Sequence, residues 1–151
     1  MSVFNDQRIF MAACGQTTTT PDDEQTELYL GLGLDELAET LVAINPKAAA
    51  EINDLVGALK DFVRIDPYEA NHVLLFDGLL DVITCFAGAG VSANLPMDAG
   101  WATVTNANMR KIDPATGQVT RREDGKILKP EGWIAPDETL RKLATGEINA
   151  L

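Results

Sequence analysis

Apolar residues recur every three to four positions along most of the chain, which is the spacing of helices that bury one face. This pattern predicts helices over residues 3–14, 21–45, 46–66, 68–87 and 96–111, and a short last helix that begins at Pro136. Gly15 is expected to end the first helix, and Pro21 and Pro46 are expected to open the second and third. The predicted fold class is therefore all-α, a bundle of four to five helices.

The segment that follows the fifth helix has a different pattern. Residues 119–129 read VTRREDGKILK, with strand-like stretches on either side of Asp124-Gly125, a dipeptide typical of hairpin turns. We therefore expect a small C-terminal hairpin beside the helices. A chain of 151 residues is long enough to bury a core without disulfides, and no internal repeat divides it, so a single domain over 1–151 is predicted.

Composition narrows the function classes. The net charge is −11, from 23 acidic residues against 12 lysines and arginines, and such a chain repels a nucleic-acid backbone. Cys14 and Cys85 lack metal-ligand spacing and lie in apolar segments, which indicates free, buried thiols in a reducing compartment. The N-terminus does not resemble a signal peptide, and no apolar run is expected to span a bilayer. We expect a soluble cytoplasmic protein with neither nucleic acid nor membrane as its partner.

Two acidic residues interrupt the apolar second helix. Glu36 and Glu39 are three residues apart and so share one helix face. A helix-packing seam lies nearly opposite this face, formed by the apolar residues at positions 30, 34, 37, 41 and 44. Apolar side chains such as Leu32 also flank the acids on their own face. The helix is therefore apolar on two sides, which predicts association with a second copy of the chain.

The fourth helix repeats this arrangement more strongly. Residues 72–88 read HVLLFDGLLDVITCFAG, apolar all round, which predicts a buried helix. Asp77 and Asp81 stack on one face of it, and neither acidic helix contains a lysine or arginine. A buried, unpaired carboxylate is costly, and a divalent cation would compensate the charge. Four carboxylates without histidine or cysteine favour Mg²⁺, with Mn²⁺ as a substitute. The alternative is an acidic, solvated surface on a non-catalytic interaction module.

The order of the motifs resembles the MazG-like all-α nucleoside triphosphate pyrophosphohydrolases, and within them a phage-type branch. The resemblance rests on Gly15-Gln16, the E-x-x-E and D-x-x-x-D helices, Asn108-Met109-x-Lys111, and the tail DGKILKPEGWIAPD at 124–137. One departure is that the family has E-x-x-D on its second acidic helix, whereas the position three before Asp81 is Gly78. The resemblance implies a MazG-like bundle assembled as a homodimer or homotetramer, located in the host cytoplasm if the protein is phage-encoded.

The resemblance also implies a reaction, the hydrolysis of a nucleoside triphosphate, with dGTP or GTP favoured, to a monophosphate and pyrophosphate. Its catalytic residues and Mg²⁺ ligands would be Glu36, Glu39, Asp77 and Asp81. Asn108 and Lys111 would hold the outgoing pyrophosphate, Gln16 would read a base edge, and Lys126 and Lys129 would contact the substrate from the tail. Asp35, about 100° away on the helix, would have a supporting role. A dUTP-preferring enzyme and a phosphoribosyl-ATP pyrophosphohydrolase remain alternatives.

Overall fold

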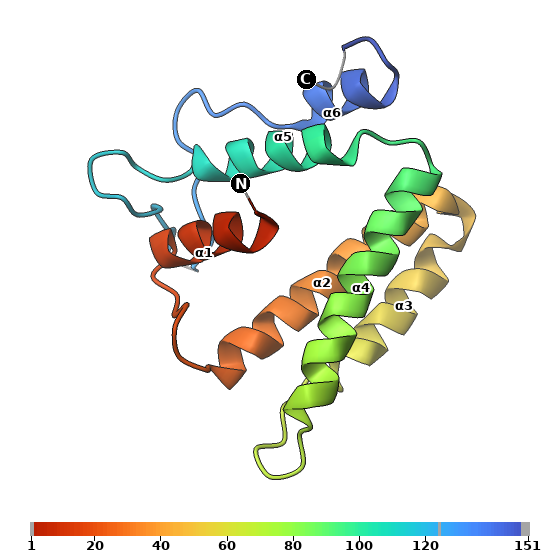
Figure 1. The fold of residues 1–151 in the computed structure, drawn as a ribbon, viewed down its shortest axis with the longest axis vertical. Coiled ribbons are helices and arrows are strands. Elements are labelled where there is room, and N and C mark those ends of the chain that lie inside the picture. The colour runs from red at the N-terminus through yellow and green to blue at the C-terminus, as the bar shows by residue number, and fades with distance from the viewer. Residues whose placement is uncertain (1, 124, 149–151) are drawn as a thin grey trace. The chain divides into compact units, whose positions relative to one another are not determined.

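The computed structural model describes residues 2–123 and 125–148. Over these ranges the chain forms six α-helices and one 3₁₀ helix, and no strand. In chain order they are α1 (Val3–Ala13), α2 (Asp23–Ile44), η1 (Pro46–Ala48), α3 (Ala49–Lys60), α4 (His72–Ser92), α5 (Met97–Met109) and α6 (Asp137–Ala144) (Figure 1). The all-α prediction is confirmed.

The helices belong to two compact units. The first unit comprises Met1–Thr18 and His72–Leu151, and the second comprises Thr19–Asn71. In the first unit α5 contacts α1, α4 and α6, whereas in the second unit α2 packs against η1 and α3 (Figure 1). The second unit is thus a helical hairpin, and α5 is the central helix of the first.

The helix ends follow the local signals in the sequence. The Asp22 side chain accepts a hydrogen bond from the backbone N–H of Gln25 at 2.9 Å, and the Ser2 hydroxyl accepts one from that of Asn5 at 3.3 Å. Both are N-terminal caps that satisfy donors left free in the first helical turn. Gly15 follows α1 with a φ of +73°, a conformation that glycine adopts without strain. The first two helices therefore lie where the pattern predicted them.

Three boundaries of α3 and α4 differ from the prediction. The third helix ends at Lys60 and the fourth begins at His72, because residues 61–71 form turns instead of helix. Asp66 explains part of this, since its side chain accepts hydrogen bonds from the backbone N–H groups of Tyr68 and Glu69 at 2.8 and 3.1 Å. Such local bonds compete with helix formation. At its other end α4 continues to Ser92, five residues beyond the predicted end.

The predicted hairpin is present only as a reversal of the chain. Antiparallel bridges join Ile112 to Val119 and Arg121 to Ile127, and neither extends into a strand in the part of the tail that the structure describes. Gly125, with a φ of +84°, lies at the second reversal. A two-stranded hairpin is marginally stable without a third strand or a helix to cover it. The expected ladder is therefore reduced to single bridges.

The prediction that α4 is a buried helix is not met inside its own unit. Val73, Phe76 and Val91 are 76%, 65% and 69% exposed, and Gly90 is the buried residue of this helix. Among the described helices of its own unit, α5 is the one that α4 contacts. Cys85 lies on α4 and is exposed, so the expectation of a buried thiol is wrong there too. Much of the apolar surface of α4 is thus not covered by the other described helices of its unit.

The length of α4 also corrects an expectation about membranes. Its 21 residues are long and apolar enough to cross a bilayer by length and composition, so the expectation that no apolar run reaches this length was wrong. A single helix of this kind is weak evidence, because core helices of soluble proteins pass the same test. Asp77 and Asp81 also oppose insertion, since an aspartate at the centre of a span costs about 2.5–3.5 kcal/mol.

Candidate functional site

The two predicted pairs of metal ligands lie on separate units. Glu36 and Glu39 are on α2 in the second unit, and Asp77 and Asp81 are on α4 in the first. All four side chains are exposed, and none of them makes a hydrogen bond or ion pair with another residue in the described ranges. Within each pair, the spacing puts both carboxylates on one helix face. The donor chemistry of each pair fits a hard cation such as Mg²⁺.

These exposures change the argument for a cation. A solvated carboxylate does not carry the desolvation cost of a buried one, so the burial argument for a compensating metal does not apply within either unit taken by itself. Among residues 2–123 and 125–148, no group of three or more histidine, cysteine or acidic side chains is assembled as a metal site. The assignment of the four acids as Mg²⁺ ligands remains a prediction.

A second acidic pair was missed in the sequence. Glu51 and Asp54, on α3, have the E-x-x-D spacing that the resembled family shows on its second acidic helix. Both are exposed, and they lie on a different face of α3 from Val56, the buried residue of that helix. The E-x-x-D spacing of Glu51 and Asp54 is visible in the sequence and could have identified this pair. Glu51 and Asp54 are therefore an alternative to Asp77 and Asp81 as the second pair of metal ligands.

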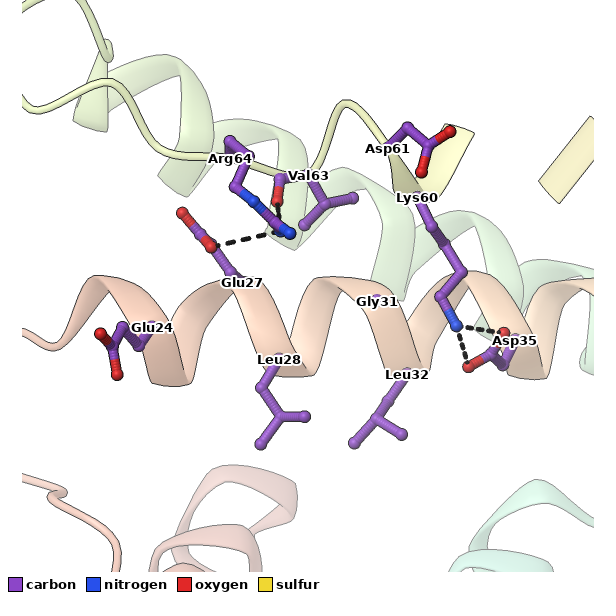
Figure 2. A pocket seen from close by; sticks show the side chains of 10 residues that line it. All are labelled: Glu24, Glu27, Leu28, Gly31, Leu32, Asp35, Lys60, Asp61, Val63 and Arg64. Atoms are coloured by element: carbon purple, nitrogen blue, oxygen red, sulfur yellow. Dashed lines mark hydrogen bonds and ion pairs between the residues drawn. The ribbon is translucent and has the colours of Figure 1, made fainter. Parts of the chain in front are cut away.

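Asp35 has a different role from its neighbours Glu36 and Glu39. The ammonium of Lys60 lies 2.8 Å from Oδ1 and 2.6 Å from Oδ2 of Asp35, so it joins α3 to α2 (Figure 2). Both side chains are about half exposed. Because a lysine already neutralises this carboxylate, Asp35 holds the helical hairpin together and is the least suited of the three acids to bind a cation.

This ion pair lines a cavity of about 610 Å³ in the second unit. At its other end, Glu27 contacts the guanidinium of Arg64 at 3.4 Å (Figure 2). Glu27 also accepts a hydrogen bond from the backbone N–H of Ile65 at 2.7 Å. Leu28 and Leu32 point away from the basic side chains of this cavity (Figure 2). The basic side chains are therefore engaged by acids of the same hairpin.

A cationic cluster lies in the first unit at the end of α5. Asn108 accepts a hydrogen bond from the ammonium of Lys111 through its amide oxygen at 2.8 Å. The ammonium of Lys111 lies 5.5 Å from the ring centroid of Trp133, and that of Lys129 lies 4.3 Å from the same centroid. The Trp133 indole N–H donates to the backbone carbonyl of Ala107 at 2.7 Å. One indole ring therefore binds two lysines beside the predicted substrate residues.

The electrostatics of this cluster favour an anion. Burial lowers the pKa of Lys111, the charge of Lys129 lowers it further, and Cys14 acts weakly in the opposite direction. Neither lysine has a carboxylate partner in the described part of the chain. An anion placed near both ammonium groups would relieve their mutual repulsion. The cluster is thus an unneutralised positive site on a protein whose net charge is −11.

The two lysines line a cavity of about 400 Å³. Arg110 is the third cation of its lining, and Asp113 is the only acid among the described residues that line it. The Asp113 carboxylate accepts a hydrogen bond from the backbone N–H of Ala115 at 2.8 Å, which stabilises the adjacent turn. This cavity could hold a phosphate or pyrophosphate group.

The other residues predicted to contact the substrate are Lys126, Lys129 and Gln16, and of these Lys129 lines the cationic cavity. Lys126 is exposed and lies outside the lining of the cationic cavity, whereas Lys129 lines it. Gln16 is half-buried in the loop after α1, and its backbone N–H donates to the carbonyl of Met11 at 3.0 Å. No pattern in the sequence ranks Lys129 above Lys126, because the contact between Lys129 and the Trp133 ring forms only in the fold.

Comparison with known proteins gives one informative match. No protein-family profile and no curated protein matches the chain. A solved structure from Exiguobacterium sp. 255-15, which carries the provisional description NTP pyrophosphohydrolase, aligns with 97% of this chain and 96% of its own at a TM-score of 0.66. The two sequences are 23% identical. At that identity the match establishes a shared all-α fold.

Proposed function

We propose that the protein is a metal-dependent nucleoside triphosphate pyrophosphohydrolase. The observation that carries this proposal is the cationic cavity, in which Asn108 and Trp133 hold Lys111 and Lys129 without a carboxylate partner among the described residues. The fold shared with a protein described as an NTP pyrophosphohydrolase supports the same reaction class. The motif resemblance in the sequence supports it independently.

In the proposed reaction, water attacks the α-phosphorus and the bond to the oxygen that bridges to the β-phosphorus breaks. The products are a nucleoside monophosphate and pyrophosphate. Lys111 and Lys129 bind the pyrophosphate end, where negative charge develops in the transition state, and Asn108 fixes the position of Lys111. Lys111 is already partly buried, so part of the cost of removing water from its ammonium is met before the anion binds.

Glu36, Glu39, Asp77 and Asp81 are the residues that would hold Mg²⁺ or Mn²⁺. The ion would neutralise part of the triphosphate charge and lower the pKa of a bound water. Without that compensation, the acids would repel the polyanion. All four carboxylates are exposed and have no basic partner among the described residues, which leaves them available for this role.

The proposed substrate is dGTP or GTP, and the proposed assembly is a homodimer or homotetramer in the cytoplasm. The resemblance to the phage-type branch supports the substrate. The exposed apolar surface of α4 supports the assembly, because monomeric soluble proteins rarely expose contiguous apolar patches of this kind. A second copy of the chain is the partner that would cover it.

The test of this function is pyrophosphate release from a panel of ribo- and deoxynucleoside triphosphates, including dUTP and phosphoribosyl-ATP, with Mg²⁺ present. We expect a monophosphate and pyrophosphate as products. Release of orthophosphate and a diphosphate would contradict the reaction. The absence of any turnover, with the metal bound, would favour the non-catalytic interaction module.

The ligand assignment is tested separately by Mn²⁺ titration. Glu39→Gln and Asp81→Asn each remove one ligand charge and should weaken Mn²⁺ binding and abolish turnover. Lys111→Ala should retain Mn²⁺ binding and lower kcat/KM, because it removes a contact to the phosphate end. Asp54→Asn is the comparison variant. If it loses the metal while Asp81→Asn keeps it, the second pair of ligands lies on α3.

A further inference from the structure

Arg110 lines the cationic cavity of the first unit and has no role in the function proposed above. It directly follows α5, it is exposed, and it shares the cavity lining with Lys111 and Lys129. Its guanidinium has no hydrogen-bond or ion-pair partner among the described residues. Asp113 is the acid of the described lining, so the three cations leave the cavity with a net positive charge. Because these cations repel one another, the cavity favours a ligand with several negative charges.

The backbone around this cavity supplies few hydrogen-bond donors. The backbone N–H groups of residues 110–113 all donate to carbonyl groups of the chain. Pro114 and Pro130 also line the cavity, and proline has no N–H group. These residues therefore offer no row of free backbone amides of the kind that binds phosphate in many proteins. An anion in the cavity would be held by the basic side chains, so its affinity depends on their number and position.

The positive charge of the cavity has two centres. The ammonium groups of Lys111 and Lys129 lie 5.5 and 4.3 Å from the same Trp133 ring centroid, so together they form one centre. Arg110 precedes Lys111 and has a helical backbone conformation, so its side chain leaves the helix axis about 100° away from that of Lys111. Both side chains nevertheless line the cavity. The guanidinium is therefore a second centre of charge, on another side of the same cavity.

Two linked phosphates match two centres of charge better than a single phosphate does. Pyrophosphate has a phosphate at each end and carries more negative charge than orthophosphate. One end can lie against the two lysines, while the planar fork of the Arg110 guanidinium binds two oxygens of the other end. The volume of about 400 Å³ lies within the range of small-ligand sites, about 300–1,000 Å³. Orthophosphate can occupy only one of the two centres at a time.

We propose that Arg110 and the lysine pair Lys111 and Lys129 form a diphosphate site that binds free pyrophosphate and selects it over orthophosphate. This inference deepens the proposed function and rests on it for one point, that pyrophosphate is the product of the reaction. Pyrophosphate in the cavity occupies the place of the β- and γ-phosphates of the next substrate. The protein is therefore inhibited by its own product, in competition with the triphosphate, until pyrophosphate leaves.

Calorimetric titration with pyrophosphate and with orthophosphate, in EDTA, measures the site itself. Without a divalent cation the acidic residues repel both anions, so binding reports the cationic cavity. The wild-type protein should bind pyrophosphate about 10- to 100-fold more tightly than orthophosphate, the value of a hydrogen bond to a charged group. Arg110→Gln should remove most of this difference. Arg8→Gln is the matched control, on an exposed arginine of α1 outside the cavity lining, and should keep it.

Lys129→Met separates the two centres of charge. It should weaken the binding of both anions and keep the ratio of their affinities, because Arg110 still binds the second phosphate. Equal affinity of the wild-type protein for the two anions, or a wild-type ratio in Arg110→Gln, would overturn the proposal. So would a ratio that is lost in Lys129→Met and kept in Arg110→Gln.

Inhibition kinetics tests the link between this site and the reaction. Pyrophosphate should inhibit turnover competitively with the triphosphate, and Arg110→Gln should raise its inhibition constant by the same factor as its Kd. Inhibition that is not competitive, or no inhibition at pyrophosphate concentrations well above the Kd, would overturn the retention of the product. If the wild-type protein hydrolyses no triphosphate, the proposed function fails, and the titrations still decide whether Arg110 selects pyrophosphate.

Discussion

Trp133 combines a structural and an electrostatic role, and two substitutions should separate them. Its indole N–H donates to the carbonyl of Ala107, a buried residue in the last turn of α5, where helix carbonyls lack partners from the helix itself. Its ring face binds the ammonium groups of Lys111 and Lys129. Trp133→Phe removes the donor and keeps a ring, whereas Trp133→Ala removes both.

The magnitudes follow from these contacts. A buried acceptor that loses its partner costs about 1–3 kcal/mol, and the half-buried position of Trp133 favours the lower end of that range. Trp133→Phe should therefore lower the free energy of unfolding by about 1–2 kcal/mol. The cation–π contacts contribute about 0.5–1 kcal/mol each at exposed sites, and phenylalanine retains part of this. We expect kcat/KM to fall less than about threefold in Trp133→Phe and about tenfold or more in Trp133→Ala.

Urea unfolding, followed by far-ultraviolet circular dichroism, measures the first effect as a change in midpoint at constant m-value. Tyr68→Phe is the control, because it removes one polar group from a residue that is 95% exposed. A Trp133→Phe protein as stable as the wild type would refute the capping role. Equal kcat/KM values for Trp133→Ala and Trp133→Phe would refute the role of the ring in holding the lysines.

Three other predictions concern separate features. Lys129→Met should raise the pKa of Lys111 toward its ordinary value near 10.5, measured by ¹³Cε titration, and a fall would contradict the proximity of the two charges. The pKa of Lys111 is lower in the folded state than in the unfolded state, so the unfolded state binds more protons just below pH 10.5. The free energy of unfolding should therefore rise with pH in that window, and it should rise less steeply in Lys129→Met. Gly33→Ala should raise the free energy of unfolding by about 0.5–1 kcal/mol, since a Cβ there meets no atom within 4 Å, whereas Gly15→Ala, at a φ of +73°, should lower it. Phe76→Arg should convert a dimer or tetramer to monomers, measured by light scattering. If the wild-type protein is itself a monomer, α4 is not an interface between copies of the chain.

The sequence by itself determined the local features of this protein. The class of fold and the starts of α1 and α2 follow from helical spacing and from capping residues close in the chain. Such signals depend on a few neighbouring residues, so they can be read without knowledge of the fold. The bounds of α3 and α4 were less accurate because turn bonds around Asp66 compete with an apolar pattern that would otherwise continue the helix.

Only the tertiary structure decided which distant side chains meet. Lys129 approaches Lys111 because Trp133 folds back on the end of α5, and Asp6 reaches Trp101 across 95 residues of chain. The exposure of α4 inside its own unit likewise depends on which helices pack against it there, whereas its apolar sequence alone predicted a buried helix. Periodicity shows which face of a helix is apolar. Whether another element covers that face depends on long-range contacts, which no local pattern encodes.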